Sequence, residues 1–169
     1  MKKTLILLLV AWILSAATAL GEGASSFSEE KTVFTESEFS VQLPQGWVIH
    51  EADREMQEAG VFFVASSPDG ECTLQIAFSA LDGVVADNTE LAAQIEEAFG
   101  NAEEITRGDI DFTAATLEQD MRLLAALDLD HDGLYMFFFT PADEAHAELC
   151  ERVFSGIERL EPETADKLH

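Results

Sequence analysis

The sequence predicts an α+β domain in which an antiparallel β-sheet is flanked by helices. Three observations lead to this fold class. Segments with the two-residue period of half-buried strands occur before and after a central helical segment, turn sequences connect the strands, and a second helical segment follows near the end of the chain. The order strands, helix, strands, helix is typical of α+β domains, in which helices cover an antiparallel sheet.

The first strand pattern covers residues 39–43, where apolar and polar residues alternate. A Pro-Gln-Gly turn then leads into a second strand at 47–49. Residues 61–65 and 72–81 flank the sequence SSPDG, so they are expected to form a hairpin. Alternate residues of its second arm share one face, and Cys72 is therefore expected to point into the core.

The central helix is expected from Asp87 to Gly100. Asp87 is a typical helix cap, an apolar residue recurs at every fourth position, and Gly100 is a typical helix stop. The pattern then returns to three or four antiparallel strands over 104–140, with turns at 108–109 and 130–133.

The last helix is expected to begin at Thr140, which can act as its cap, with Pro141 at the first helical position. Its apolar stripe is formed by Leu149, Val153 and Ile157. This stripe predicts that the helix packs on the sheet.

The N-terminus has the three parts of a cleavable secretory signal peptide. Two lysines precede an uninterrupted apolar stretch at 5–14, and small residues follow at 17–19. The signal peptide is expected to be residues 1–19, with cleavage at 21 as the alternative. The apolar stretch is about half the length of a membrane-spanning helix, and no cysteine follows it directly. No stable membrane anchor is therefore expected after cleavage, and the protein is expected to be exported to the periplasm or the extracellular medium.

The exported part is expected to contain one domain. Residues 20–31 are small, polar and acidic and predict a flexible leader. Residues 32–160 have the size of a single α+β domain, and residues 161–169 form a tail.

The charge of the chain is strongly negative, at −24. Signal cleavage would remove two of the nine basic residues, Lys2 and Lys3, and none of the 33 acidic ones, which gives about −26. Such a field repels phosphate backbones and anionic lipids, so the sequence argues against nucleic acid and membrane-surface binding. The negative charge is compatible with binding of basic partners or divalent cations. The alternative is that the charge only keeps an exported protein in solution.

The chain resembles the PsbP/Mog1-like domains of many exported bacterial proteins. The resemblance covers about residues 33–160 and rests on the segment FSVQLPQGW at 39–47, the central helix, the late strands and the segment FSGI at 154–157. It implies a PsbP/Mog1-like sandwich and a non-catalytic accessory or binding role. The plant member is an accessory subunit of the oxygen-evolving complex, and the yeast member binds a small GTPase. The photosynthetic members dock through basic residues that this acidic chain lacks, so their partner and site are not carried over.

Residues 128–133 resemble the start of a calcium-binding loop. Asp128, Asp130 and Asp132 stand at alternate positions before Gly133, but the twelfth position, where a glutamate is required, is Phe139. The alternative interpretation is an acidic hairpin turn that leads into a buried strand.

Two cysteines, Cys72 and Cys150, are the only ones in the chain. Export to an oxidising compartment allows a disulfide between them, and two buried, inert thiols are the alternative. His146 and Cys150 have the spacing of metal ligands on one helix, but a zinc site needs three or four protein ligands and no further pair is visible.

The sequence contains no nucleophile elbow, phosphate-binding loop, dinucleotide fingerprint or HExxH motif. His50 and Glu51 could join a catalytic site only through folding that the sequence does not reveal. The expected function is therefore a non-enzymatic accessory or protein-interaction module without a cofactor. A small-ligand or divalent-cation binder is the first alternative, and a hydrolase is the second.

Overall fold

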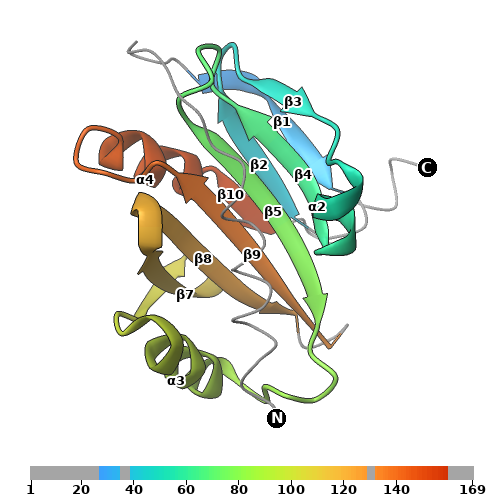
Figure 1. Ribbon diagram of the computed structural model, residues 1–169, viewed down its shortest axis with the longest axis vertical. Helices are drawn as coiled ribbons and strands as arrows, with labels where there is room; N and C mark the ends of the chain where they lie inside the picture. Colours follow the sequence, from blue (N-terminus) through green and yellow to red (C-terminus); the bar gives the residue numbers. More distant parts are fainter. Residues whose placement is uncertain (1–26, 35–38, 129–131, 160–169) are drawn as a thin grey trace.

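The computed structural model describes residues 27–34, 39–128 and 132–159. Antiparallel strands form a seven-stranded sheet in the order β3-β4-β5-β9-β8-β7-β6 and a three-stranded sheet in the order β1-β2-β10. Figure 1 shows the helices α2, α3 and α4 around the large sheet. This architecture confirms the predicted α+β class with a mostly antiparallel sheet.

The large sheet consists of β3 (Val48–His50), β4 (Val61–Ser66), β5 (Thr73–Ala80), β9 (Gly133–Thr140), β8 (Met121–Asp128), β7 (Ile110–Leu117) and β6 (Glu103–Arg107). The remaining elements are β1 (Phe27–Phe34), β2 (Phe39–Pro44), β10 (Ile157–Arg159), α2 (Arg54–Glu58), α3 (Asn88–Phe99), α4 (Ala147–Ser155) and the 3-10 turn η1 (Glu118–Asp120).

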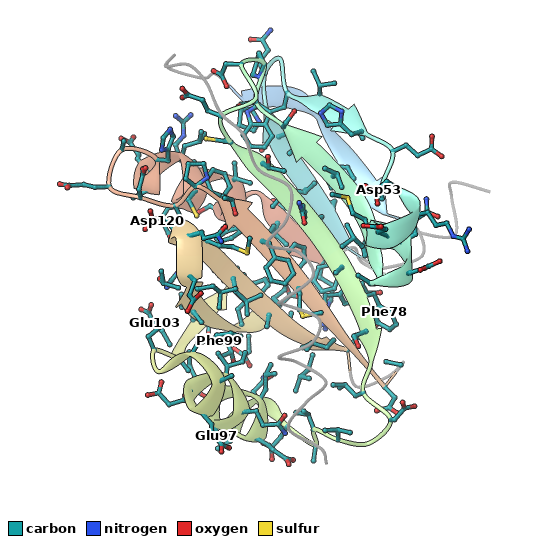
Figure 2. The ribbon with its side chains drawn as sticks, viewed as in Figure 1. Asp53, Phe78, Glu97, Phe99, Glu103 and Asp120 are labelled. Carbon is teal, nitrogen blue, oxygen red and sulfur yellow. The ribbon has the colours of Figure 1, made fainter. Side chains whose placement is uncertain are left out.

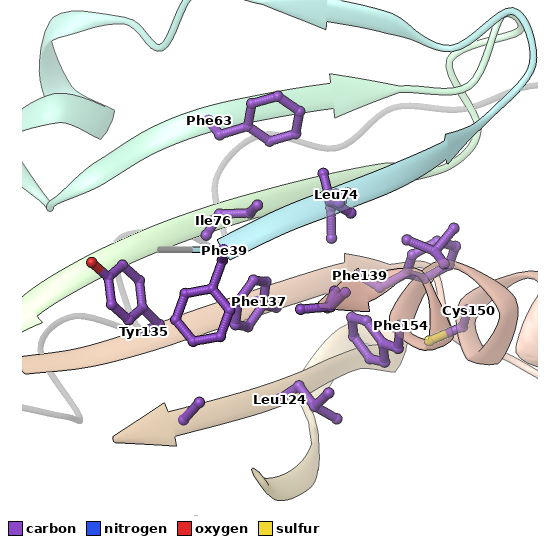
Figure 3. Close-up of a cluster of buried hydrophobic side chains, with 14 of the residues drawn as sticks. Phe39, Phe63, Leu74, Ile76, Leu124, Tyr135, Phe137, Phe139, Cys150 and Phe154 are labelled. Carbon is purple, nitrogen blue, oxygen red and sulfur yellow. The ribbon is translucent and has the colours of Figure 1, made fainter. Parts of the chain in front are cut away.

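Strand β9 stands in the middle of the large sheet and is buried on both faces. Its alternate residues enter two separate cores. Tyr135, Phe137 and Phe139 point into the core between the two sheets, which Figure 3 shows, while Met136 and Phe138 point into the core on the other face. The ring of Phe137 makes an edge contact with Phe39 of β2 at a centroid distance of 5.7 Å.

The two faces of the large sheet are covered differently. Helix α3 packs against β7 on the face to which Met136 and Phe138 point, with Leu91 and Ile95 fully buried. The opposite face is covered by the three-stranded sheet and α4, which contributes Val153 and Phe154. A helix therefore lies on each face, as expected, but the sequence did not predict the second sheet that shares the cover of one face with α4.

The predicted leader also needs correction. Strand β1 begins at Phe27, so residues 27–31 belong to a strand that pairs with β2 rather than to a flexible segment. The polar composition of 27–31 suggested a leader, but an edge strand of a small sheet does not require an apolar pattern. The signal peptide at 1–19, the rest of the leader and the tail at 161–169 lie outside the described residues.

The hairpin of β4 and β5 and the central helix agree with the sequence. Asp87 accepts a hydrogen bond from the Glu90 backbone N–H at 2.9 Å and so caps α3. Gly100 ends the helix with a left-handed φ of 75° and donates its N–H to the Glu96 carbonyl at 2.8 Å.

The start of the last helix differs from the prediction. Thr140 is the final residue of β9 and pairs with Thr73, and the Thr140–Pro141 bond is cis. Helix α4 begins at Ala147, and Ile157 belongs to β10 instead of the helix. The physical reason is that the extended backbone of Thr140 continues the ladder of β9 by pairing with Thr73 of β5, so Thr140 ends a strand instead of capping a helix.

Substitution of Gly133 tests the packing at the start of β9. A Cβ atom at this position would overlap Cε2 and Cζ of Phe78. We expect Gly133→Ala to lower the free energy of unfolding by about 1–3 kcal/mol, the usual cost of overpacking. Urea unfolding of Gly133→Ala, Phe78→Leu and the double variant measures it. The double variant should be more stable than the sum of the two single effects; additive effects would contradict the clash.

Candidate interaction surface

Cys72 and Cys150 are both buried, and both are free thiols. The disulfide that the sequence left open is therefore not formed, and the alternative of two buried thiols is correct. Both side chains belong to the core between the sheets, and Figure 3 shows Cys150 beside Phe154. Burial raises the pKa of Cys72 to about 11 and that of Cys150 to about 12, and neighbouring carboxylates add to both effects. A thiol held protonated is a poor nucleophile for disulfide exchange.

The predicted calcium residues lie at the connection between β8 and β9. Asp128 is the buried last residue of β8, where it pairs with Gly133, and Asp132 is exposed. Asp130 lies outside the described residues. Phe139, which occupies the twelfth position, is fully buried in the core and contacts the ring of Phe154. The hairpin that the alternative interpretation predicted is present, and no cluster of three or more metal-ligating side chains occurs in the part of the chain described here.

His146 connects the start of α4 with the turn of the β4–β5 hairpin. Its Nδ1 lies 2.7 Å from Asp143 Oδ1, and its Nε2 lies 3.7 Å from Glu71 Oε2. The hydrogen bond with Asp143 is the main reason that the pKa of His146 is raised, and the same bond lowers the pKa of Asp143. His146 thus connects the loop before α4, through Asp143, with the β4–β5 turn, through Glu71, and we call these contacts the His146 clamp. Cys150, its suggested zinc co-ligand, is directed into the core.

His50 is brought to a serine that the sequence did not pair with it. Its Nε2 lies 2.6 Å from Ser66 Oγ in an exposed contact between β3 and β4. A serine hydrolase also requires a group that orients the histidine and donors that stabilise an oxyanion. Among the described residues, the hydrogen bond of the His50 ring is with Ser66 Oγ, so the pair forms a contact between neighbouring strands.

Exposed carboxylates dominate the surface, while the arginines are engaged within the molecule. Arg54, Arg107 and Arg122 form ion pairs with glutamates, and Arg159 lies over the ring of Phe39. Helix α3 contains no basic residue. Figure 2 shows acidic side chains at both margins of the large sheet, at α3 and β6 and again at α2. The described surface therefore presents negative charge that internal pairs balance only in part.

Exposed apolar side chains gather at one edge of the large sheet. Val48 is 49%, Ile49 54% and Phe62 41% exposed, and these are the exposed large apolar residues among those described. They lie on β3, the edge strand, and on its neighbour β4. The sequence predicted a strand at 47–49 but not its place at the edge, because three consecutive apolar residues look the same in a buried strand. We use the term β3 edge for Val48, Ile49 and Phe62 together with the side of β3 that faces away from β4.

Comparison with known proteins supports the fold. No protein-family model matches the chain, and no curated protein matches it significantly. Among solved structures, the chain is similar to the solution structure of cyanobacterial PsbP (CyanoP) from Synechocystis sp. PCC 6803, with a TM-score of 0.54 and 15% sequence identity. The match covers 85% of this chain and 98% of that one. The PsbP-like fold that the sequence resemblance implied is thus confirmed. In the described residues no helix has the length and hydropathy needed to span a bilayer.

The His146 clamp predicts a pH-dependent contribution to stability. Because the pKa of His146 is raised above its ordinary value of 6.5, the protonated ring stabilises the fold below that value, and this effect is lost as the pH rises through the raised pKa. His146→Gln should therefore lower the free energy of unfolding more at mildly acidic than at alkaline pH. For a partly exposed pair, the difference between the two pH values should be about 0.5 kcal/mol. Thermal unfolding at both pH values measures it, with His50→Gln as the control. An equal cost at both pH values would contradict the clamp.

The buried thiols predict slow chemical modification. A pKa raised from 9.0 to about 11 lowers the thiolate fraction of Cys72 about 100-fold near neutral pH. We expect both cysteines to resist a thiol-reactive dye in the native protein and to react fully, as two thiols per chain, after unfolding without a reductant. Failure to titrate two thiols in the unfolded, unreduced chain would show a disulfide instead.

Proposed function

We propose that the protein is an exported, non-enzymatic accessory module that binds another protein carrying a basic surface. The observation that carries this proposal is the charge distribution. Acidic side chains lie at both margins of the sheet, whereas Arg54, Arg107 and Arg122 form ion pairs with glutamates of the same molecule. A surface of this kind attracts and orients a positively charged partner.

Two further observations support the accessory role. The fold is PsbP-like, and one solved structure that shares it is that of a cyanobacterial PsbP. The N-terminal sequence has the three parts of a secretory signal, which would place the protein in the periplasm or outside the cell. A soluble module in these compartments meets other envelope or secreted proteins, and its own acidity keeps it away from anionic lipid surfaces.

Affinity capture tests the proposal. The immobilised protein is incubated with the envelope and secreted fractions of the cells that produce it, at low salt and again at about 1 M salt, where the Debye length is about 3 Å. We expect a stoichiometric protein partner at low salt that elutes at high salt and is displaced by polylysine, which competes for the acidic surface, but not by an uncharged polymer of the same length.

Two outcomes would contradict the proposal. One is the lack of any stoichiometric partner in both fractions. The other is a partner that high salt and polylysine leave bound. If no partner is captured and a small ligand or divalent cation raises the melting temperature, the result favours the alternative function of a ligand-binding protein.

A further inference from the structure

We infer that the β3 edge is the contact strand for the partner, and that it pairs with an extended segment in which apolar residues alternate and lysine or arginine flanks them. The inference rests on the proposed function, because it names the surface and the chemistry through which the proposed partner is bound. This mode of binding adds a strand to an exposed sheet edge, so that backbone hydrogen bonds supply affinity and side chains supply specificity.

The backbone of β3 is available for such pairing. β3 is the last strand of the large sheet, and within residues 27–34, 39–128 and 132–159 it pairs with β4 alone, through Val48 with Ser66, Ile49 with Ala65 and His50 with Val64. Alternate residues of an edge strand direct their N–H and C=O groups away from the sheet. These groups can receive the backbone of another chain.

The opposite edge of the sheet shows how this protein protects a strand that should not pair. β6 exposes Glu103 and Glu104, and Arg122 binds Glu103 across the surface with an Nη2–Oε2 distance of 2.9 Å. Charged side chains on an edge discourage pairing with other chains. β3 has exposed Val48 and Ile49 in the corresponding place, so the two edges of one sheet are built for different purposes.

The apolar side chains of the β3 edge can contact an added strand on both faces. Val48 and Ile49 are consecutive and therefore point to opposite faces of the sheet, each about half exposed. Ile49 lies on the face of Ala65, which belongs to the core between the sheets. Phe62 extends the exposed apolar surface along β4 and lies 6.4 Å from the ring of Tyr135.

Charge determines which segment fits this edge. Glu51 directly follows β3, and Asp53 and Glu55 follow in the connection and in α2, all of them exposed. Arg54, the nearby base, forms an exposed ion pair with Glu58 at an Nε–Oε1 distance of 2.9 Å. A segment flanked by lysine or arginine would meet these carboxylates. A second copy of the chain would instead bring together two molecules with a net charge of −24 each.

A synthetic peptide tests the inference directly. The probe is an acetylated, amidated peptide in which valine and threonine alternate over six residues between two lysines on each side. Trp47 directly precedes β3, and in a chain with Trp12→Phe it is the single tryptophan. We expect the peptide to change the fluorescence of Trp47 in a saturable manner. The same peptide with glutamate in place of lysine should not bind.

Matched variants locate the binding site. Val48→Thr together with Ile49→Thr keeps β-branched residues in the strand but removes exposed apolar groups, and it should raise the Kd at least about fivefold. Glu51→Gln should raise the Kd about two- to fivefold at low salt, whereas Glu104→Gln on the opposite edge should leave it unchanged. N-methylation of alternate peptide backbone nitrogens should abolish binding. Circular dichroism and thermal unfolding confirm that each variant is folded.

Three results would overturn the inference. The first is no binding of the lysine peptide to the parent chain. The second is binding that the valine–isoleucine variant and backbone methylation leave unchanged. The third is a dimer in sedimentation equilibrium that the same variant dissociates, which would make a second copy the occupant of the edge.

The proposed function can fail separately. Affinity capture could yield a salt-sensitive partner that binds the Val48→Thr, Ile49→Thr variant as well as the parent chain. This result would support the proposed accessory function but contradict the assignment of the β3 edge as the contact strand. If the lysine peptide binds at β3 while capture yields no stoichiometric partner, the edge is a real strand-binding site and the proposed accessory function is wrong.

Discussion

Burial of β9 on both faces is the constraint on which the rest of the structure depends. β9 lies in the middle of a seven-stranded sheet and directs aromatic residues to one face and apolar residues to the other. Both faces of the sheet must therefore be covered by other elements. Helix α3 contributes to one cover, and the small sheet with α4 provides the other. The small sheet is thus required by the core, since Phe137 and Phe139 would otherwise face solvent.

Much of the fold follows from local signals in the sequence. The β4–β5 hairpin has a turn sequence of its own, and α3 has a cap at Asp87 and a stop at Gly100, so their boundaries could be read without tertiary information. β10 could not be predicted, because three residues have no measurable period and its partner β2 lies more than a hundred residues earlier. At Thr140 a local cap signal competed with pairing to Thr73, and the pairing prevailed.

The candidate surface was less predictable than the fold. Sequence directed attention to residues with recognisable chemistry, namely the aspartates at 128–132, the two cysteines and His146. The structure places the cysteines in the core and gives His146 carboxylate neighbours. The β3 edge carries no chemical motif. Val48 and Ile49 resemble core residues until the strand order of the sheet is known, because exposure at an edge is a property of topology rather than of composition.

The small sheet has a mechanical consequence. β1 and β10 both run antiparallel to β2 and flank it, so the described chain enters and leaves the fold along the same strand. Phe27 pairs near Pro44, at one end of β2, and Arg159 pairs with Phe39, at the other. Tension applied between these two points would load the ladders of β2 in shear, with their hydrogen bonds resisting together instead of opening one after another. A module pulled between Phe27 and Arg159 would therefore bear the force first through the small sheet.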